Sequence, residues 1–83
     1  MKFFTYILES STTERFYIGS TNNLEKRIFQ HNKGYNKSTK SDTPWKLIHY
    51  FSCSTRSEAF KLEMKLKKMK SRKRVLSFIN NSK

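Results

Sequence analysis

The sequence has little that could form covalent cross-links or cross a membrane. Its 83 residues include one cysteine, one proline and two glycines. Cys53 alone cannot form an internal disulfide, which fits a reducing, cytoplasmic setting. No apolar run approaches the roughly 20 residues of a membrane span, so we expect no membrane partner. No repeat or linker divides the chain, and we expect a single domain over residues 1–83.

Acidic residues are also scarce. Six Asp and Glu stand against eighteen Lys and Arg, which gives a formal net charge of +12. A charge of this size repels itself unless a polyanion neutralises it. Nucleic acid is therefore the first partner to consider, and an anionic membrane surface is the second. The shortage of carboxylates also leaves few oxygen ligands for a hard divalent cation.

Three stretches have the composition of β-strands. Aromatic and β-branched residues are frequent in Lys2–Leu8, Phe16–Gly19 and Trp45–Cys53. A short polar connection separates the first two stretches, so we expect them to form an antiparallel hairpin.

Helices account for most of the remaining chain. We expect one from Asn22 to about Lys33, one from Thr55 to about Lys70, and a short one from Ser71. The first two begin with Asn or Thr three residues before Glu, which is the spacing of a capping box. Residues 35–43 are polar and basic and predict an exposed loop. The order ββαβαα predicts a mixed α+β fold, with a small three-stranded antiparallel sheet flanked by helices.

Glu63 is the acidic residue in the least ordinary position. At about 100° per residue it lies inside the apolar arc of its helix, beside Ala59 and Leu66. A carboxylate in this position must be paired, hydrogen-bonded or bound to a metal ion, because burying an unpaired charge is costly. An ion pair with Lys67, one helical turn away, is the simplest alternative to a metal site.

Other candidate residues lie in the amino-terminal half. Arg27 and His31 are one helical turn apart, so a cation and a titratable imidazole share one face, a combination suited to phosphate chemistry. Tyr6 and Tyr17 fall on neighbouring strands of the expected hairpin, and Gly19 permits a close backbone approach. Taken singly, the tyrosines suit core packing, and Arg27 and His31 suit a solvated helix face.

Together these residues resemble the GIY-YIG nuclease superfamily, in particular its small single-domain bacterial excision-nuclease-like members. The resemblance rests on Thr5-Tyr6-Ile7-Leu8, Tyr17-Ile18-Gly19, Arg27, His31 and the helical segment from Glu58 to Lys67. Phe4-Thr5-Tyr6 stands in place of Gly-Ile-Tyr, and Ser20 stands where the excision nucleases carry Lys. Lys26 and Lys40 are candidates to replace that cation, and Asn32 is a candidate polar helper.

The resemblance implies a metal-dependent endonuclease acting on DNA, with structure-selective or nonspecific cleavage and a role in repair or recombination. Glu63 would hold one Mg²⁺ or Mn²⁺ ion, and Arg27 would neutralise charge on the phosphoryl oxygens. Tyr17 or Tyr6 would orient or deprotonate the attacking water, with His31 assisting. The roles of Tyr17 and His31 are interchangeable at this stage.

Exposed cations would bind the nucleic-acid backbone. The candidates are Lys26, Lys33, Lys37, Lys40, Lys70, Arg72, Lys73 and Arg74, each of which could serve solubility instead. Two other functions fit the charge: a noncatalytic nucleic-acid-binding module of the same fold, and a basic protein-interaction or membrane-surface domain. The sequence also leaves open a protein partner that supplies targeting.

Overall fold

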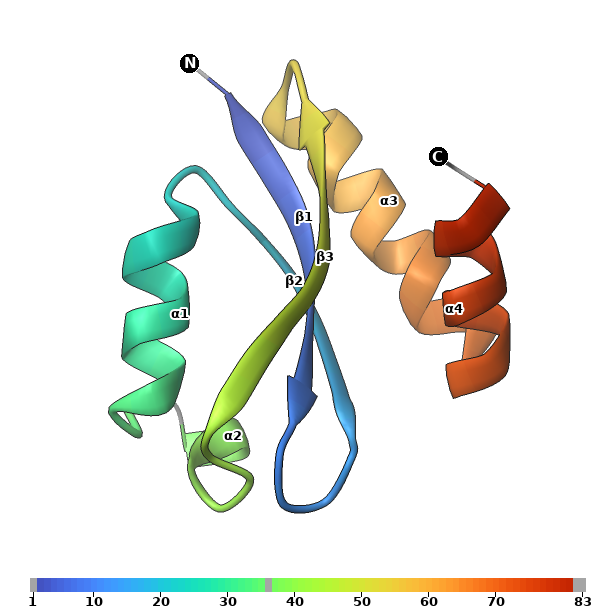
Figure 1. Cartoon of the computed structure of the whole chain (residues 1–83). Coiled ribbons are helices and arrows are strands. Elements are labelled where there is room, and N and C mark those ends of the chain that lie inside the picture. Colours follow the sequence, from blue (N-terminus) through green and yellow to red (C-terminus); the bar gives the residue numbers. More distant parts are fainter. Residues whose placement is uncertain (1, 36, 82–83) are drawn as a thin grey trace.

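The computed structural model describes residues 2–35 and 37–81. The expectation of one domain over residues 1–83 therefore includes positions outside the described residues. The elements are β1 (Phe3–Ser10), β2 (Phe16–Thr21), α1 (Leu24–Asn32), α2 (Lys37–Lys40), β3 (Trp45–Cys53), α3 (Arg56–Met69) and α4 (Arg72–Asn81) (Figure 1). The predicted order ββαβαα is confirmed, with the four-residue α2 added between α1 and β3.

The three strands form one antiparallel sheet in the order β2-β1-β3. The short connection predicted the β1–β2 hairpin correctly, and its register places Tyr6 opposite Gly19 and Leu8 opposite Tyr17. Since β1 has neighbours on both sides, β2 is an edge strand with one side of its backbone unpaired within the sheet.

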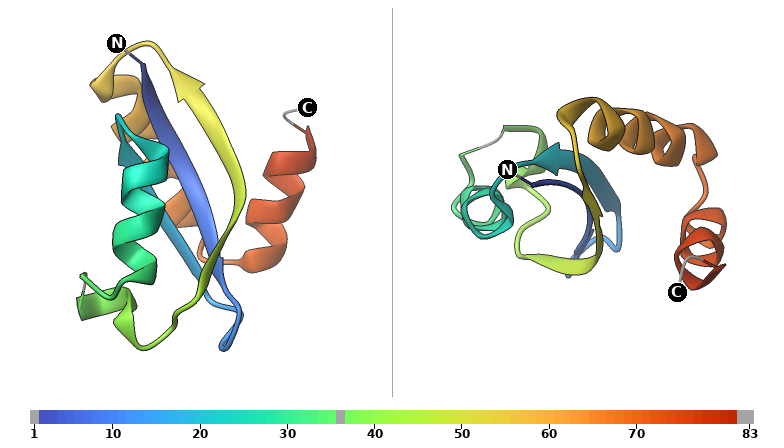
Figure 2. Two further views of the ribbon diagram at one scale, coloured as in Figure 1. Left: turned by 60° about the vertical axis from the view of Figure 1, so that its left-hand side comes forward. Right: turned by 90° about the horizontal axis from the view of Figure 1, so that it is seen from above.

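Helices cover both faces of the sheet. Figure 2 shows α1 on one side, and α3 with α4 on the other. Because successive strand residues point to opposite faces, β1 contributes to two cores. Ile7 packs with Leu66, Val75 and Ile79 beneath α3 and α4, whereas Tyr6, Leu8 and Trp45 pack on the side of α1. None of the helices within the described residues is long and apolar enough to span a membrane.

The helix ends differ in detail from the capping boxes that the sequence predicted. The N-cap of α1 is Asn23, whose side chain accepts a hydrogen bond from the Lys26 N–H, and not Asn22. Thr55 caps α3 as predicted and accepts from the Glu58 N–H. Gly34 follows α1 with φ of 76°, a left-handed conformation that glycine adopts without a steric penalty.

The segment between α1 and β3 departs from the predicted exposed loop. It contains α2, and both Thr39 and Asp42 are buried. The Trp45 indole donates to the Thr39 carbonyl at 2.9 Å, and the Ser10 hydroxyl donates to the Asp42 carbonyl at 2.6 Å. The Asp42 carboxylate pairs with Arg15 at 3.1 Å. Long-range hydrogen bonds therefore hold this polar segment over one end of the sheet.

Candidate active site

Tyr6 lies at the centre of the candidate site. Its side chain projects from the central strand toward α1 and is fully buried. The hydroxyl lies 3.2 Å from His31 Nε2 and receives a hydrogen bond from Arg27 Nε at 3.4 Å. The helical spacing of Arg27 and His31 thus brings both side chains to one phenol, because α1 packs with this face on the sheet.

These groups form a continuous chain of hydrogen bonds. Arg27 can only donate, so the Tyr6 oxygen accepts from it. Between Tyr6 and His31 Nε2, and between His31 Nδ1 and the Thr39 hydroxyl 3.0 Å away, the imidazole tautomer decides which atom donates. In either tautomer His31 is held from two sides, and its second partner comes from α2.

Gly19 is required by the position of the Tyr6 ring. A Cβ at this residue would lie 2.6 Å from the Tyr6 hydroxyl oxygen, 2.8 Å from its Cζ and 3.2 Å from Tyr17 Cε1. The backbone at Gly19 does not have a positive φ. The missing side chain, and not an unusual dihedral angle, lets the phenol lie across the neighbouring strand.

Tyr17 completes the aromatic group beside Gly19. Its ring centroid lies 4.6 Å from that of His31 and 6.3 Å from that of Tyr6. Unlike Tyr6, Tyr17 is only partly buried. The hydrogen bond to Tyr6 is the largest cause of the raised pKa of Arg27, and a hydrogen bond to Tyr17 raises this pKa further. The guanidinium therefore serves both phenols.

Burial controls the protonation of this cluster. It raises the pKa of Tyr6 to about 12, although the hydrogen bond from Arg27 opposes the shift. Burial also lowers the pKa of His31 from its usual 6.5, and the positive charge of Arg27 lowers it further. At neutral pH the cluster consists of a neutral phenol, a neutral imidazole and a permanent cation.

Glu63 reaches this cluster from the other layer of the fold. Ser20, next to Gly19 on the edge strand, donates to Glu63 Oε1 at 2.8 Å. Lys67 donates to Oε2 at 2.7 Å, so the simple ion pair expected from the sequence is present. The negative charge of Glu63 contributes to the raised pKa of Tyr6. The carboxylate is therefore paired, hydrogen-bonded and electrostatically coupled to the tyrosine cluster at once.

The donor set suits a hard cation that keeps most of its water. Within residues 2–35 and 37–81 no group of three or more His, Cys, Asp or Glu residues could hold a metal ion. Each Glu63 oxygen accepts one hydrogen bond and retains a further lone pair. One carboxylate fits Mg²⁺ or Mn²⁺, because Mg²⁺ is commonly bound by one or two carboxylates, waters and substrate phosphate oxygens.

The predicted nucleic-acid-binding residues have different surroundings. Lys26, Lys33, Lys40 and Lys73 are exposed, and Lys37 belongs to α2 with its side chain outside the described part of the structure. Lys26 also lines a hollow of about 230 Å³ next to Arg27. Arg72 is engaged within the protein: it pairs with Glu9, donates to the Glu14 carbonyl at 2.7 Å and covers the Phe16 ring.

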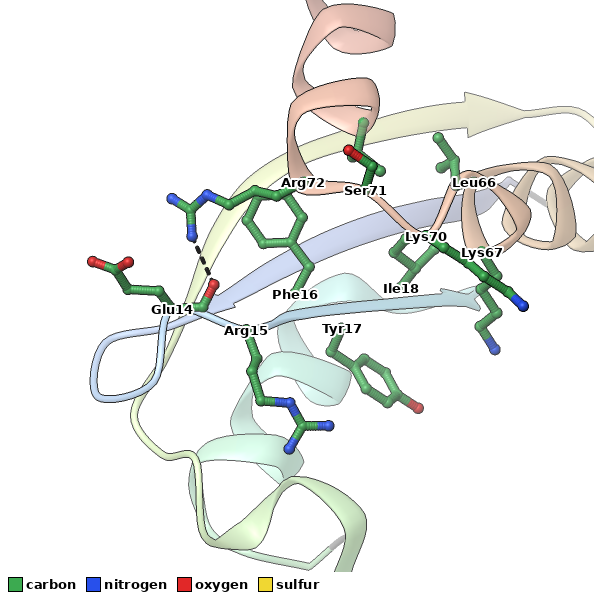
Figure 3. Close-up of a pocket in the computed structure, with 11 residues that line it drawn as sticks. Glu14, Arg15, Phe16, Tyr17, Ile18, Leu66, Lys67, Lys70, Ser71 and Arg72 are labelled. Carbon is green, nitrogen blue, oxygen red and sulfur yellow. Dashed lines mark hydrogen bonds between the residues drawn. The ribbon is translucent and has the colours of Figure 1, made fainter.

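Three features of the site escaped sequence reasoning. Thr39, the second partner of His31, lies in a segment whose polarity suggested only solvent exposure. Asn32, proposed as a polar helper, instead bonds the backbone N–H and carbonyl of Trp45 and anchors α1 to β3. A pocket beside Tyr17 is built from residues far apart in sequence and has no local signal (Figure 3).

The chain is similar in sequence and fold to known proteins. The model of the GIY-YIG catalytic domain matches residues 2–75. A UPF0213 protein of Syntrophus aciditrophicus is 44% identical over 70 residues, which cover 82% of this chain and 79% of that protein. The UPF0213 protein YsiG of Lactococcus lactis is 38% identical over 81 residues, with 96% and 77% covered.

A solved structure supports the same assignment. The solution NMR structure of a UPF0213 protein from Bacillus halodurans is similar with a TM-score of 0.60 and 27% identity, over 96% of this chain and 84% of that one. The resemblance seen in Tyr6, Tyr17-Ile18-Gly19 and the α3 segment is thereby confirmed. These similarities extend over most of the sequence and show that the chain belongs to the GIY-YIG family, a superfamily of nuclease domains.

Proposed function

We propose that this protein is a divalent-metal-dependent endonuclease that hydrolyses phosphodiester bonds, with DNA as the favoured substrate. One observation carries the proposal. The Arg27–Tyr6–His31 chain of one layer and the Glu63 carboxylate of the other are coupled across Gly19 and Ser20. A fixed cation, a carboxylate and nearby phenols are groups that can bind and hydrolyse a phosphodiester.

Arg27 is the residue we assign to the phosphate. Its Nε is used by Tyr6, and its Nη1 donates to Gln30 Oε1 at 3.4 Å, so the side chain is oriented from two sides. Arg27 also hydrogen-bonds to Tyr17, and a guanidinium has five N–H groups, so donors remain for phosphoryl oxygens as negative charge grows on them. Tyr6 thus acts as a positioning residue for Arg27.

Tyr17 is better suited than Tyr6 to orient or deprotonate the attacking water. The hydroxyl of Tyr6 is buried, occupied by His31 and Arg27, and has a pKa of about 12. Both ring nitrogens of His31 have partners, so we assign His31 to holding Tyr6. Tyr17 is partly exposed, and its hydrogen bond with Arg27 places it beside the residue assigned to the phosphate.

Glu63 is the residue we assign to the metal ion. When bound, one Mg²⁺ or Mn²⁺ ion supplies Lewis-acid polarisation of the phosphate and stabilisation of the leaving oxygen. Ser20 fixes the orientation of Oε1, and Lys67 balances the charge of the carboxylate until a cation arrives. The two hydrogen bonds hold the ligand in place before any ion binds.

The exposed lysines support backbone binding. Contacts from Lys26, Lys33, Lys40 and Lys73 to phosphates carry no sequence information and weaken with salt. We therefore propose structure-selective or broadly nonspecific cleavage in the cytoplasm, in DNA repair or recombination. A protein partner for targeting is compatible with this activity.

Cleavage of labelled single-stranded, nicked, branched and duplex DNA in Mg²⁺ or Mn²⁺ tests the proposal, with EDTA as the metal-free control. Glu63→Gln and Arg27→Ala should bind DNA and lose at least about a hundredfold in cleavage rate. Glu58→Gln, on an exposed position of the same helix, is the matched control and should cut at the parent rate.

The rival function gives a different result. A noncatalytic nucleic-acid-binding module would bind the same DNAs with strong salt dependence and cut none of them in either metal. If Glu63→Gln cuts as fast as Glu58→Gln, the assignment of the metal ligand is wrong. Neither result depends on knowing the natural substrate.

A further inference from the structure

A pocket of about 390 Å³ opens along the outer edge of β2, where this strand faces the corner between α3 and α4. Its wall is apolar and consists of Phe16, Ile18, Leu66 and Val75. Figure 3 shows Phe16 and Arg72 on one side of this pocket and Lys67 and Lys70 on the other. The size and the lining are typical of sites for small organic groups.

The rim of the pocket is cationic. Arg15, Lys67 and Lys70 all line it and are exposed. Glu14 is the acidic residue among the lining side chains, and the Arg72 guanidinium binds its backbone carbonyl. An apolar wall with exposed cations beside it complements a nucleotide, which joins a flat, uncharged base to an anionic phosphate.

Two residues connect this pocket to the candidate active site. Tyr17 lines the pocket and contacts the His31 ring, with centroids 4.6 Å apart. Lys67 also lines the pocket and donates to Glu63 at 2.7 Å. A nucleic-acid strand with a phosphate between Arg27 and Glu63 would therefore bring an adjacent nucleotide to the mouth of the pocket.

We propose that this pocket receives one unpaired nucleobase of the substrate, next to the phosphate that is cut. The proposal rests on the proposed endonuclease function and specifies its substrate class. A base within a duplex is stacked and cannot enter a pocket at the edge of a strand without leaving the helix. The preferred substrates are therefore nucleic acids with a bulged, flipped or single-stranded nucleotide at the cleavage position.

The test compares two DNA duplexes and leaves the protein unchanged. Each has one extrahelical nucleotide at the same position: an adenosine in the first, and an abasic tetrahydrofuran residue in the second. Binding is measured by fluorescence anisotropy in EDTA, and cleavage is measured separately in Mg²⁺. Since stacking of one base on protein groups strengthens binding substantially, the abasic duplex should bind at least about fivefold more weakly. Equal affinity overturns the proposal.

A pair of protein variants locates the effect. Phe16→Leu removes an aromatic ring from the pocket wall, whereas Phe60→Leu makes the same change at an exposed position on α3 outside the pocket. Phe16→Leu should reduce the preference for adenosine over the abasic residue, and Phe60→Leu should keep it. Thermal unfolding confirms that both variants are folded. If Phe16→Leu keeps the full preference, the base binds elsewhere and the assignment is wrong.

The two readouts separate this proposal from the nuclease proposal. A base preference in EDTA without any cleavage in Mg²⁺ supports the pocket and contradicts the enzyme. Cleavage with equal affinity for both duplexes supports the enzyme and contradicts the pocket. A concentration-dependent dimer that Phe16→Leu abolishes would assign the edge of β2 to a second copy of the chain and would also overturn the proposal.

Discussion

Gly19→Ala probes the contact on which the site depends, the crossing of the Tyr6 ring over β2. In an ordinary strand this substitution stabilises the protein, because alanine has less conformational entropy to lose than glycine, by about 0.5–1 kcal/mol. At Gly19 the new Cβ would lie 2.6 Å from the Tyr6 oxygen and 2.8 Å from its Cζ. The structure therefore predicts the opposite sign.

The magnitude has two parts. Overpacking of a well-packed interior costs about 1–3 kcal/mol. If the Tyr6 ring moves to relieve the clash, its hydroxyl also loses its hydrogen bonds to His31 and Arg27, at a further cost of about 1–3 kcal/mol. We expect the free energy of unfolding to fall by about 3 kcal/mol, and the melting temperature to fall by about 12–24 °C for a domain of this size.

Urea and thermal unfolding, followed by circular dichroism, measure the effect. Tyr6→Phe supplies an internal control, because it removes the oxygen that makes the shortest contact. In that background Gly19→Ala should cost about 1 kcal/mol less than in the parent, which is a measurable coupling between neighbours. The reasoning is refuted if Gly19→Ala is neutral or stabilising, or if its cost is the same in both backgrounds.

Three further predictions concern metal, pH and salt. Lys67→Met removes the ammonium that pairs with the Glu63 carboxylate and should tighten Mn²⁺ binding about two- to fivefold in titration calorimetry. Lys68→Met, the control, should leave Mn²⁺ affinity unchanged. Weaker Mn²⁺ binding in Lys67→Met would contradict the assignment of Glu63 as the metal ligand. Because the pKa of His31 is lowered in the folded state, the unfolded chain binds more protons below about pH 6.5, so the parent should lose stability as pH falls through this range. In urea unfolding, the difference in the free energy of unfolding between pH 7 and pH 5 should be smaller in His31→Gln than in the parent. An unchanged difference would contradict the role of His31 in this pH dependence. Lys73→Gln should make the negative slope of log K for DNA association against log salt concentration shallower by about one unit in binding titrations. An unchanged slope would mean that Lys73 contacts no phosphate.

Local patterns in the sequence were sufficient for every element except α2 and singled out several residues of the candidate site. The composition of three strands and the helical spacing of Arg27 and His31 depend only on neighbours in the chain, and both are confirmed. Glu63 was singled out because a carboxylate in an apolar arc needs partners, and the structure supplies two of them, Ser20 and Lys67. The ion pair with Lys67 and the proposed role as a metal ligand are therefore compatible descriptions of Glu63.

Features that depend on distant contacts could not be predicted. Thr39 and Asp42 are buried because Trp45 and Ser10 reach their carbonyl groups, and no property of the polar segment itself signals this. The choice of Asn23 over Asn22 as N-cap depends on backbone geometry that two adjacent asparagines do not distinguish. The pocket beside Tyr17 exists only where an edge strand meets the corner between two helices.

The position of Glu63 in a different layer from Arg27 has a consequence for the growing or partly unfolded chain. Synthesis of the chain produces the guanidinium and imidazole first and the carboxylate some thirty residues later. The two sets of groups meet only after α3 has docked beneath the hairpin, so under the proposed function a fragment or nascent chain without α3 lacks the metal ligand. Under the proposed function, activity therefore requires the tertiary structure that joins α3 to the hairpin.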